Sequence, residues 1–273
     1  TFTVRCTVFL PDMQYTLKKQ LGQHFLKDEQ LCQQIVAATK TAMQEHQLQQ
    51  LVEVGPGAGA ITKYLHRLEG INFKAIELDA EKVAYLQHTY PVLNDKLIHE
   101  SILDTAPPFE GAFAVVGNFP YNISSQILFR MLDWRNQVPT IVGMFQKEVA
   151  QRVAASAGSK VYGVISVLLQ AYFDITYLFD VPPQAFNPPP KVMSGVIVLH
   201  RKTAIPNFYS DKAFNTLVKM AFNQRRKTLR NATRSLFAPE VLAQPIFEKR
   251  AEQLTVADFA DLTHHMLLAK ANK

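Results

Sequence analysis

The sequence has few of the residues that build disulfide frameworks, metal sites or membrane spans. Cysteine occurs only at Cys6 and Cys32 among 273 residues, which excludes a cysteine-based metal set and fits a reducing compartment. The longest apolar run, residues 161–173, is too short to span a bilayer and contains Gln170. Residues 1–10 lack the pattern of a secretory signal. We therefore expect a globular cytoplasmic protein with no membrane segment and no metal.

Acidic residues are scarce in the last quarter of the chain. Residues 201–273 hold 13 Lys and Arg against 6 Asp and Glu, a net charge of +7, whereas residues 1–200 have a net charge of −1. A basic excess confined to one part indicates a polyanionic partner, most often nucleic acid. The alternative is an ordinary solvated basic surface.

Strand-like and helical patterns alternate over residues 28–150, which predicts βαβ units and a mostly parallel sheet with helices on both faces. The expected strands of this region are residues 51–54, 73–77, 96–99, 113–116 and 140–145. Residues 172–181 and 192–199 flank a proline-rich loop and are expected to close the sheet as an antiparallel pair. We predict an α/β domain over residues 13–200 and a small all-α domain over residues 201–273. Residues 1–12 are expected to be an extension, either disordered or not native, with Met13 as a plausible start.

A glycine-rich loop, "EVGPGAGA" (residues 53–60), follows the first predicted strand. Glycines let the backbone approach a ligand without a Cβ collision, and a following helix would add N–H donors. Glu77 ends the next strand, where a carboxylate can accept hydrogen bonds from a ribose diol. This pattern indicates a nucleoside-containing cofactor and does not choose between a dinucleotide and S-adenosylmethionine. A tight turn without a ligand is the alternative.

The stretch "GNFPYN" (residues 117–122) follows the fourth strand, at the sheet edge where ligands bind. The Asn118 side chain and the carbonyl of Phe119 before Pro120 offer two acceptors for a planar NH₂ group. Tyr121 offers a ring on which a flat base can stack. Such a trap would free the nitrogen lone pair for attack on a sulfonium methyl, which favours amino-methyl transfer over hydride transfer. An ordinary β-turn is the alternative.

Taken together, the motifs resemble those of the small-subunit ribosomal RNA adenine-N6 dimethyltransferases of bacteria and their archaeal and eukaryotic relatives, from about Leu17 to Leu236. The matching stretches are "LGQHFLKD" (21–28), "EVGPGAGAIT" (53–62), "IELD" (76–79), "GNFPYNIS" (117–124), "QKEVAQRV" (146–153), "VPPQAFNPPPKV" (181–192) and "FNQRRKTLRN" (222–231). The resemblance implies a Rossmann-like class I methyltransferase fold with a seven-stranded sheet. It also implies transfer of four methyls from S-adenosylmethionine to two adjacent adenosines near the 3′ end of small-subunit rRNA, in an immature subunit, by a monomer.

The resemblance also assigns residues by position. The cofactor contacts it implies are His24, Leu26, Gly55, Glu77, Ser101 and Asn118. The target-base residues it implies are Asn118, Pro120, Tyr121 and Phe186, the last as a second stacking ring. Three positions depart from the family pattern. Phe119 replaces a more usual leucine, His24 stands where many members have asparagine, and Ser101 stands where an acid usually reads the cofactor adenine. Asp104 is an alternative to Ser101 for that role.

A cluster of basic residues is the predicted RNA contact. It comprises Arg225, Arg226, Lys227, Arg230 and Arg234. In a continuous helix, Arg226, Arg230 and Arg234 would lie four residues apart on one face. Their charges would repel one another unless an anion such as phosphate lay against them. Lys147, which opens "KEVAQRV", is a further candidate, although that stretch is also consistent with an i,i+4 pair within a helix.

Two other functions remain open from the sequence. The Asn-x-Pro-Tyr motif is shared with amino-methyltransferases that act on protein glutamine, although the basic C-terminal part disfavours that activity. The second alternative is a factor for subunit assembly in which catalysis is secondary.

Overall fold

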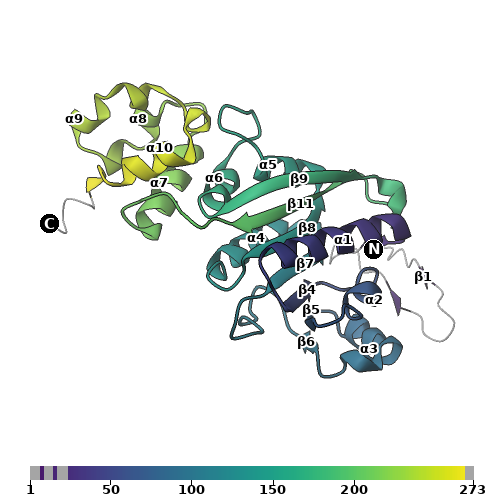
Figure 1. Cartoon of the computed structure of the whole chain (residues 1–273). Helices are drawn as coiled ribbons and strands as arrows, with labels where there is room; N and C mark the ends of the chain where they lie inside the picture. Colours follow the sequence, from purple (N-terminus) through teal and green to yellow (C-terminus); the bar gives the residue numbers. More distant parts are fainter. Residues whose placement is uncertain (1–6, 9–14, 17–23, 268–273) are drawn as a thin grey trace. The chain divides into compact units, whose positions relative to one another are not determined.

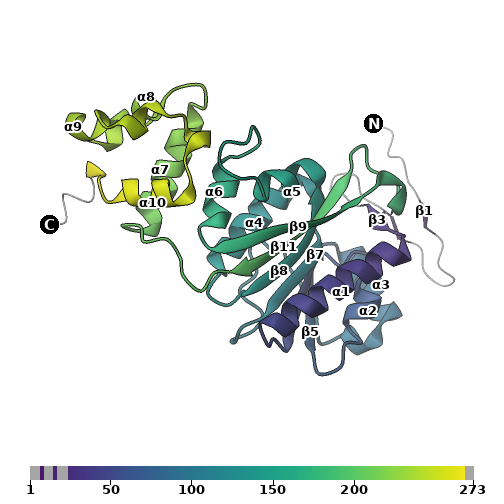
Figure 2. The ribbon, with the colours of Figure 1, turned by 45° about the horizontal axis from the view of Figure 1, so that its top comes forward.

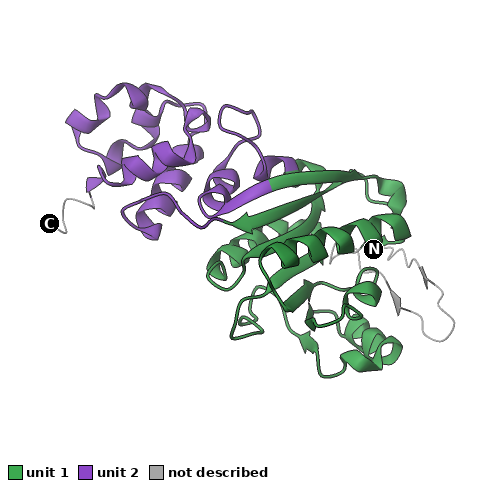
Figure 3. Cartoon of the chain, in the orientation of Figure 1, with its two compact units in different colours: residues 1–150, 176–201 green, residues 151–175, 202–273 purple. Residues whose placement is uncertain are grey.

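The computed structural model describes residues 7–8, 15–16 and 24–267. The chain divides into two compact units, residues 1–150 with 176–201 and residues 151–175 with 202–273 (Figure 3). The sequence placed residues 151–175 in the first domain, whereas here they belong to the second unit. The prediction for residues 1–12 lies outside the described residues, except that Thr7–Val8 (β1) pairs with Tyr15–Thr16 (β2).

The first unit is built on a seven-stranded sheet (Figure 1), of which only residues 173–175, at the start of one edge strand, fall in the second unit. Its strand order is β6-β5-β4-β7-β8-β11-β9, and all pairs from β6 to β8 are parallel, while β11 runs antiparallel to β8. The strands are β4 (Gln50–Val54), β5 (Asn72–Glu77), β6 (Leu97–His99), β7 (Ala114–Asn118), β8 (Thr140–Gln146), β9 (Phe173–Val181) and β11 (Ser194–Arg201). The predicted α/β class with a mostly parallel seven-stranded sheet is confirmed.

Helices cover both faces of this sheet (Figure 2). They are α1 (Glu29–Glu45), α2 (Thr62–Leu65), α3 (Ala80–Thr89), α4 (Ser124–Asp133) and the start of α5 (Lys147–Val153). Because side chains alternate along a strand, residues such as Val116 and Val142 point to the α1 side and their neighbours point to the α4 side. The helix α1 begins where the Asp28 side chain accepts a hydrogen bond from the backbone N–H of Leu31 at 3.1 Å.

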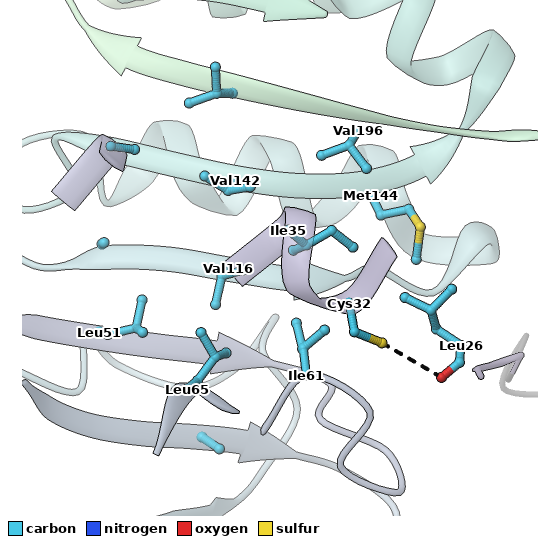
Figure 4. Packing of buried hydrophobic residues seen from close by; sticks show 14 of the residues in the cluster. Leu26, Cys32, Ile35, Leu51, Ile61, Leu65, Val116, Val142, Met144 and Val196 are labelled. Atoms are coloured by element: carbon cyan, nitrogen blue, oxygen red, sulfur yellow. Dashed lines mark hydrogen bonds between the residues drawn. The ribbon is translucent and has the colours of Figure 1, made fainter. Parts of the chain in front are cut away.

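The core under α1 is continuous from the helix into the strands of the large sheet (Figure 4). Cys32 and Ile35 of α1 face Val116, Val142 and Val196, and all five side chains are fully buried. Burial raises the pKa of the Cys32 thiol to about 12, so this cysteine behaves as a small apolar side chain rather than a nucleophile.

A separate, two-stranded sheet joins the proline-rich loop to the segment that directly precedes α1. In it β10 (Phe186–Asn187) pairs with β3 (Phe25–Leu26), with Phe186 opposite Leu26. The backbone N–H of Lys27 also donates to the carbonyl of Ala185 at 2.8 Å. Residues about 160 positions apart are thereby fixed beside each other.

The second unit is helical. It contains α6 (Val164–Gln170), α7 (Asp211–Asn223), α8 (Leu229–Ala232), α9 (Pro239–Leu242) and α10 (Val256–Thr263), with short 3-10 turns between them. The helix α7 is capped by Ser210, and Thr255 and Asp258 form a capping box on α10. Phe214 and Phe259, fully buried on these two helices, belong to the core of the unit.

Candidate active site

A cavity of about 260 Å³ opens at the carboxyl ends of β4, β5, β6 and β7. This is the edge at which parallel strands of an open α/β sheet place ligands. Eight residues predicted from the sequence line it: His24, Leu26, Gly55, Glu77, Ser101, Asn118, Pro120 and Tyr121. Phe186 and Asp104 were also predicted and do not line it.

The glycine loop forms the floor of the cavity after β4. Gly55, Gly57 and Gly59 have φ values of +68°, +57° and +84°, a left-handed region that other residues rarely adopt. A Cβ at Gly59 would lie 2.9 Å from the Tyr90 ring, whereas at Gly57 the nearest atom is 4.0 Å away. The loop therefore presents bare backbone to the cavity at Gly57. The predicted following helix is a single turn, α2, so its dipole adds little.

Glu77 is held by the loop from the neighbouring strand. Its Oε2 accepts a hydrogen bond from the N–H of Gly57 at 3.0 Å, and its Oε1 accepts one from the N–H of Asp79 at 2.9 Å. Burial raises its pKa above the ordinary value. Each carboxylate oxygen has a second acceptor position, so Glu77 can still accept hydrogen bonds from a diol in the cavity.

Glu53 is a cavity residue that was not predicted from the sequence. Burial raises its pKa to about 8, and its Oε2 has no hydrogen-bond partner among the described residues. A buried polar atom without a partner is rare unless a ligand or water completes it. The signal in the sequence was an acid inside the otherwise apolar strand Leu51–Val54.

Asn118 ends β7 and is oriented by a backbone contact. Its Nδ2 donates to the carbonyl of His24 at 3.3 Å, which leaves its Oδ1 as an acceptor toward the cavity. The Phe119 ring is buried and packs against Phe145 in a tilted arrangement with centroids 4.9 Å apart, so the side chain that replaces the usual leucine points into the core. In the described part of the chain, no hydrogen bond reaches the Phe119 carbonyl.

Three rings stand next to this acceptor pair. The His24 ring lies 5.6 Å from Tyr121 and 6.4 Å from Phe186 between centroids. His24 also forms a hydrogen bond through Nδ1 with the carbonyl of Pro188 at 2.9 Å. The Phe186 ring is only 1% exposed, so in this structure it packs behind His24 and offers no open stacking face.

Tyr121 is anchored by a residue that the sequence did not reveal. Its hydroxyl and the hydroxyl of Ser194, at the start of β11, lie 2.5 Å apart and share a hydrogen bond. Burial raises the pKa of Tyr121, so its phenol is neutral at ordinary pH.

The loop after β6 carries the predicted adenine-reading position. The Ser101 Oγ accepts a hydrogen bond from the N–H of Leu103 at 3.2 Å, and Ser101 lines the cavity together with its neighbour Glu100. The alternative residue, Asp104, donates its backbone N–H to the Ser101 carbonyl and does not line the cavity. The geometry favours Ser101 over Asp104.

The predicted RNA contacts differ in their exposure, in the backbone elements that carry them and in whether they already have a partner. Arg225, Arg226 and Lys227 lie exposed in a turn between α7 and α8, so they do not continue a helix with Arg230 and Arg234. The helical stacking expected from their spacing is wrong, because Thr228 adopts an extended conformation before α8.

Three of the predicted basic residues already have partners. Arg225, although exposed, donates a hydrogen bond to the carbonyl of Lys160. Arg230 pairs with Glu248 at 2.7 Å and donates to the carbonyl of Leu242 at 3.0 Å. In the first unit, Lys147 pairs with Asp180 at 2.6 Å.

With this geometry established, the sequence matches the family described as ribosomal RNA adenine dimethylase over residues 14–267. The chain belongs to this family. It is 49% identical over 250 residues to the ribosomal RNA small subunit methyltransferase A of Cytophaga hutchinsonii, covering 90% of this chain and 96% of that one. It is 48% identical to the protein of the same name from Flavobacterium johnsoniae, covering 90% and 94% of the two chains.

Solved structures agree with the fold of this adenine dimethylase family member. A dimethyladenosine transferase from Plasmodium falciparum matches with a TM-score of 0.73 at 24% identity, covering 91% of this chain and 98% of that one. The 23S rRNA methyltransferase ErmE matches with a TM-score of 0.64 at 20% identity, covering 87% and 99%. Both support the class I methyltransferase architecture.

The site's residues fit a nucleoside cofactor. The open backbone at Gly57 allows close approach, the Glu77 carboxylate can accept hydrogen bonds from a ribose diol, and the unpartnered Oε2 of Glu53 leaves a buried polar group for a ligand to satisfy; all three residues line one cavity. Among residues 24–267 and the short β1–β2 pair, no group of three side chains is suited to a metal ion, and no helix is long and apolar enough to cross a membrane.

Proposed function

We propose that this protein transfers methyl groups from S-adenosylmethionine to the exocyclic amine of two adjacent adenosines near the 3′ end of small-subunit rRNA. The products are N6,N6-dimethyladenosines. The observation that carries the proposal is the pair of free acceptors, Asn118 Oδ1 and the Phe119 carbonyl, beside the cavity that holds Glu77 and the glycine loop. Membership of the rRNA adenine dimethylase family identifies the amine as that of adenine in rRNA.

The protein's residues would act by binding and orientation. When bound, the cofactor supplies an electrophilic methyl on a sulfonium centre. Asn118 and the Phe119 carbonyl accept the two N–H donors of the target amine, which frees its lone pair for in-line attack. Tyr121 carries the base by stacking, and His24 extends the aromatic wall.

No strong base is needed before attack, because the proton can leave after the methyl has transferred. The neutral Tyr121 phenol and the amide of Asn118 are poor bases, in agreement with this order. Ionisation of the amine is not required for the reaction.

We further propose that exposed arginines and lysines of the second unit bind rRNA phosphates. Arg225, Arg226, Lys227 and Arg234 are exposed, and each neutralised phosphate adds to the salt dependence of binding. Arg230 and Lys147 contribute less to RNA binding, since each already pairs with an acid. We expect the enzyme to act as a monomer, in the cytoplasm, on an immature small subunit.

The test is mass spectrometry of rRNA from unmethylated small ribosomal subunits incubated with the protein and S-adenosylmethionine. We expect two adjacent dimethyladenosines near the 3′ end. Their absence with an assembly-competent subunit would refute the proposal. Asn118→Ala should abolish methylation while subunit binding is retained, which separates an enzyme from an assembly factor that acts by binding alone.

A further inference from the structure

The hydroxyl that holds Tyr121 comes from the first residue of a distant strand. Ser194 is fully buried at the start of β11, and its Oγ lies 2.5 Å from the Tyr121 Oη, 73 positions away in sequence. Across the ladder, Ser194 pairs with Gln146, two residues beyond Met144, which pairs with Asn118. The register of the sheet therefore carries Ser194 to the edge where the acceptors lie.

Tyr121 itself has little else to fix its ring. It sits in a single 3-10 turn, Tyr121–Ile123, after the extended Pro120. The ring is partly exposed, and its tilted contact with His24 spans 5.6 Å. The hydrogen bond at the far end of the ring is thus the polar contact that fixes where the Tyr121 ring lies.

The strand that carries Ser194 is also tightly packed on its opposite face. At the next residue, Gly195, a Cβ would lie on that face and only 2.3 Å from the Tyr177 hydroxyl. Tyr177 donates to Asp180 at 2.5 Å, and Asp180 pairs with Lys147. This packing fixes the strand that presents the Ser194 hydroxyl.

We infer that Ser194 is a positioning residue for the target base: its hydroxyl fixes the position of the Tyr121 ring, on which the adenine stacks beside the Asn118 acceptor. The inference rests on the proposed function and adds to it a residue that makes no contact with cofactor or base. Ser194 acts only through Tyr121. Loss of its hydroxyl lets the ring tilt and leaves a largely buried phenol unpaired.

The first test is a double-mutant cycle on methylation of unmethylated small ribosomal subunits. Ser194→Ala should lower kcat about five- to tenfold while the KM for S-adenosylmethionine stays within about twofold. Tyr121→Phe should give a similar loss. In the Tyr121→Phe background, Ser194→Ala should add no further loss, because its partner is already gone.

The matched control is Thr140→Val. Thr140 is a buried hydroxyl on β8, at the opposite end of the same antiparallel strand pair, where its Oγ1 donates to the carbonyl of Leu199 at 3.0 Å. Its loss should lower thermal stability without changing kcat more than about twofold. An equal kcat loss in Thr140→Val, or an additive loss in the double mutant, would overturn the inference.

A second readout does not depend on activity. In protein labelled with 3-fluorotyrosine, the ¹⁹F signal that disappears in Tyr121→Phe reports the ring environment. Ser194→Ala should shift that signal, and an unchanged signal would overturn the inference. If wild-type protein formed no dimethyladenosine while the signal shifted, the proposed function would fail and the contact between the two hydroxyls would stand.

Discussion

Replacing Gly117 with alanine tests whether the site depends on the close spacing between β7 and β4. An ideal Cβ at Gly117 lies 2.6 Å from the carbonyl oxygen of Val54 and 2.9 Å from Cε1 of Phe119. Gly117 is not among the residues with positive φ, so the substitution adds a clash without backbone strain. The clash is with backbone, which cannot rotate away as a side chain can.

The size of the effect follows from these distances. A carbon and a carbonyl oxygen normally approach no closer than about 3.3 Å, so the two strands must separate by about 0.7 Å. Overpacking of this kind costs about 1–3 kcal/mol of the free energy of unfolding, or roughly 2–10 °C in Tm. Asn118 and Phe119 follow directly, and a misplacement of about 1 Å costs on the order of a hundredfold in rate. We therefore expect kcat to fall about 10- to 100-fold.

The assay combines thermal unfolding with methylation of unmethylated subunits at a temperature where the variant is folded. Gly111→Ala is the matched control, because its nearest neighbour is the end of the flexible Gln50 side chain at 3.4 Å. It should leave both Tm and kcat close to those of the wild type. A Gly117→Ala protein with wild-type kcat would refute the link between strand spacing and the acceptor geometry.

Three further predictions concern charge. Ser101→Asp should tighten S-adenosylmethionine binding about five- to tenfold by calorimetry, because a carboxylate accepts more strongly than a hydroxyl; an unchanged Kd would contradict this. The raised pKa of Glu53 means that its folded-state ionisation is unfavourable, so stability of the ligand-free protein should fall as pH rises from about 5 toward 8. Glu53→Gln should flatten that slope, by up to about 1 kcal/mol per pH unit in urea unfolding, and an unaltered slope would count against the assignment. Arg226→Ala should lower the salt dependence of rRNA binding by about one ion, whereas Arg230→Ala should mainly reduce stability through loss of the Glu248 pair; the reverse pattern would contradict the division between free and paired arginines.

The sheet and the cofactor half of the site were predictable because their signals are local. Each predicted parallel strand matches an observed one within a few residues, and the acids and glycines stand directly after strand ends. Since the carboxyl ends of parallel strands share one edge, Gly55, Glu77, Ser101 and Asn118 could be brought together without a structure.

The other half depends on contacts between distant segments. The hydroxyl pair of Tyr121 and Ser194 has no signature in the sequence, because it depends on the register of β11 against β8. Phe186 was expected as a second stacking ring, yet its pairing with Leu26, 160 residues earlier, buries it. The turn at Arg226 could not be predicted, because helical spacing alone does not show where the backbone leaves the helix.

The pairing of β3 with β10 also has a consequence for synthesis of the protein. His24 lines the cavity and bonds to the carbonyl of Pro188, 164 positions later, while its own carbonyl receives the Asn118 amide. A nascent chain that stops before this loop has emerged has the glycine loop and Glu77 but lacks the wall that His24 completes. The wall that His24 completes therefore forms only after about two thirds of the chain has left the ribosome, so the cavity is completed late in translation.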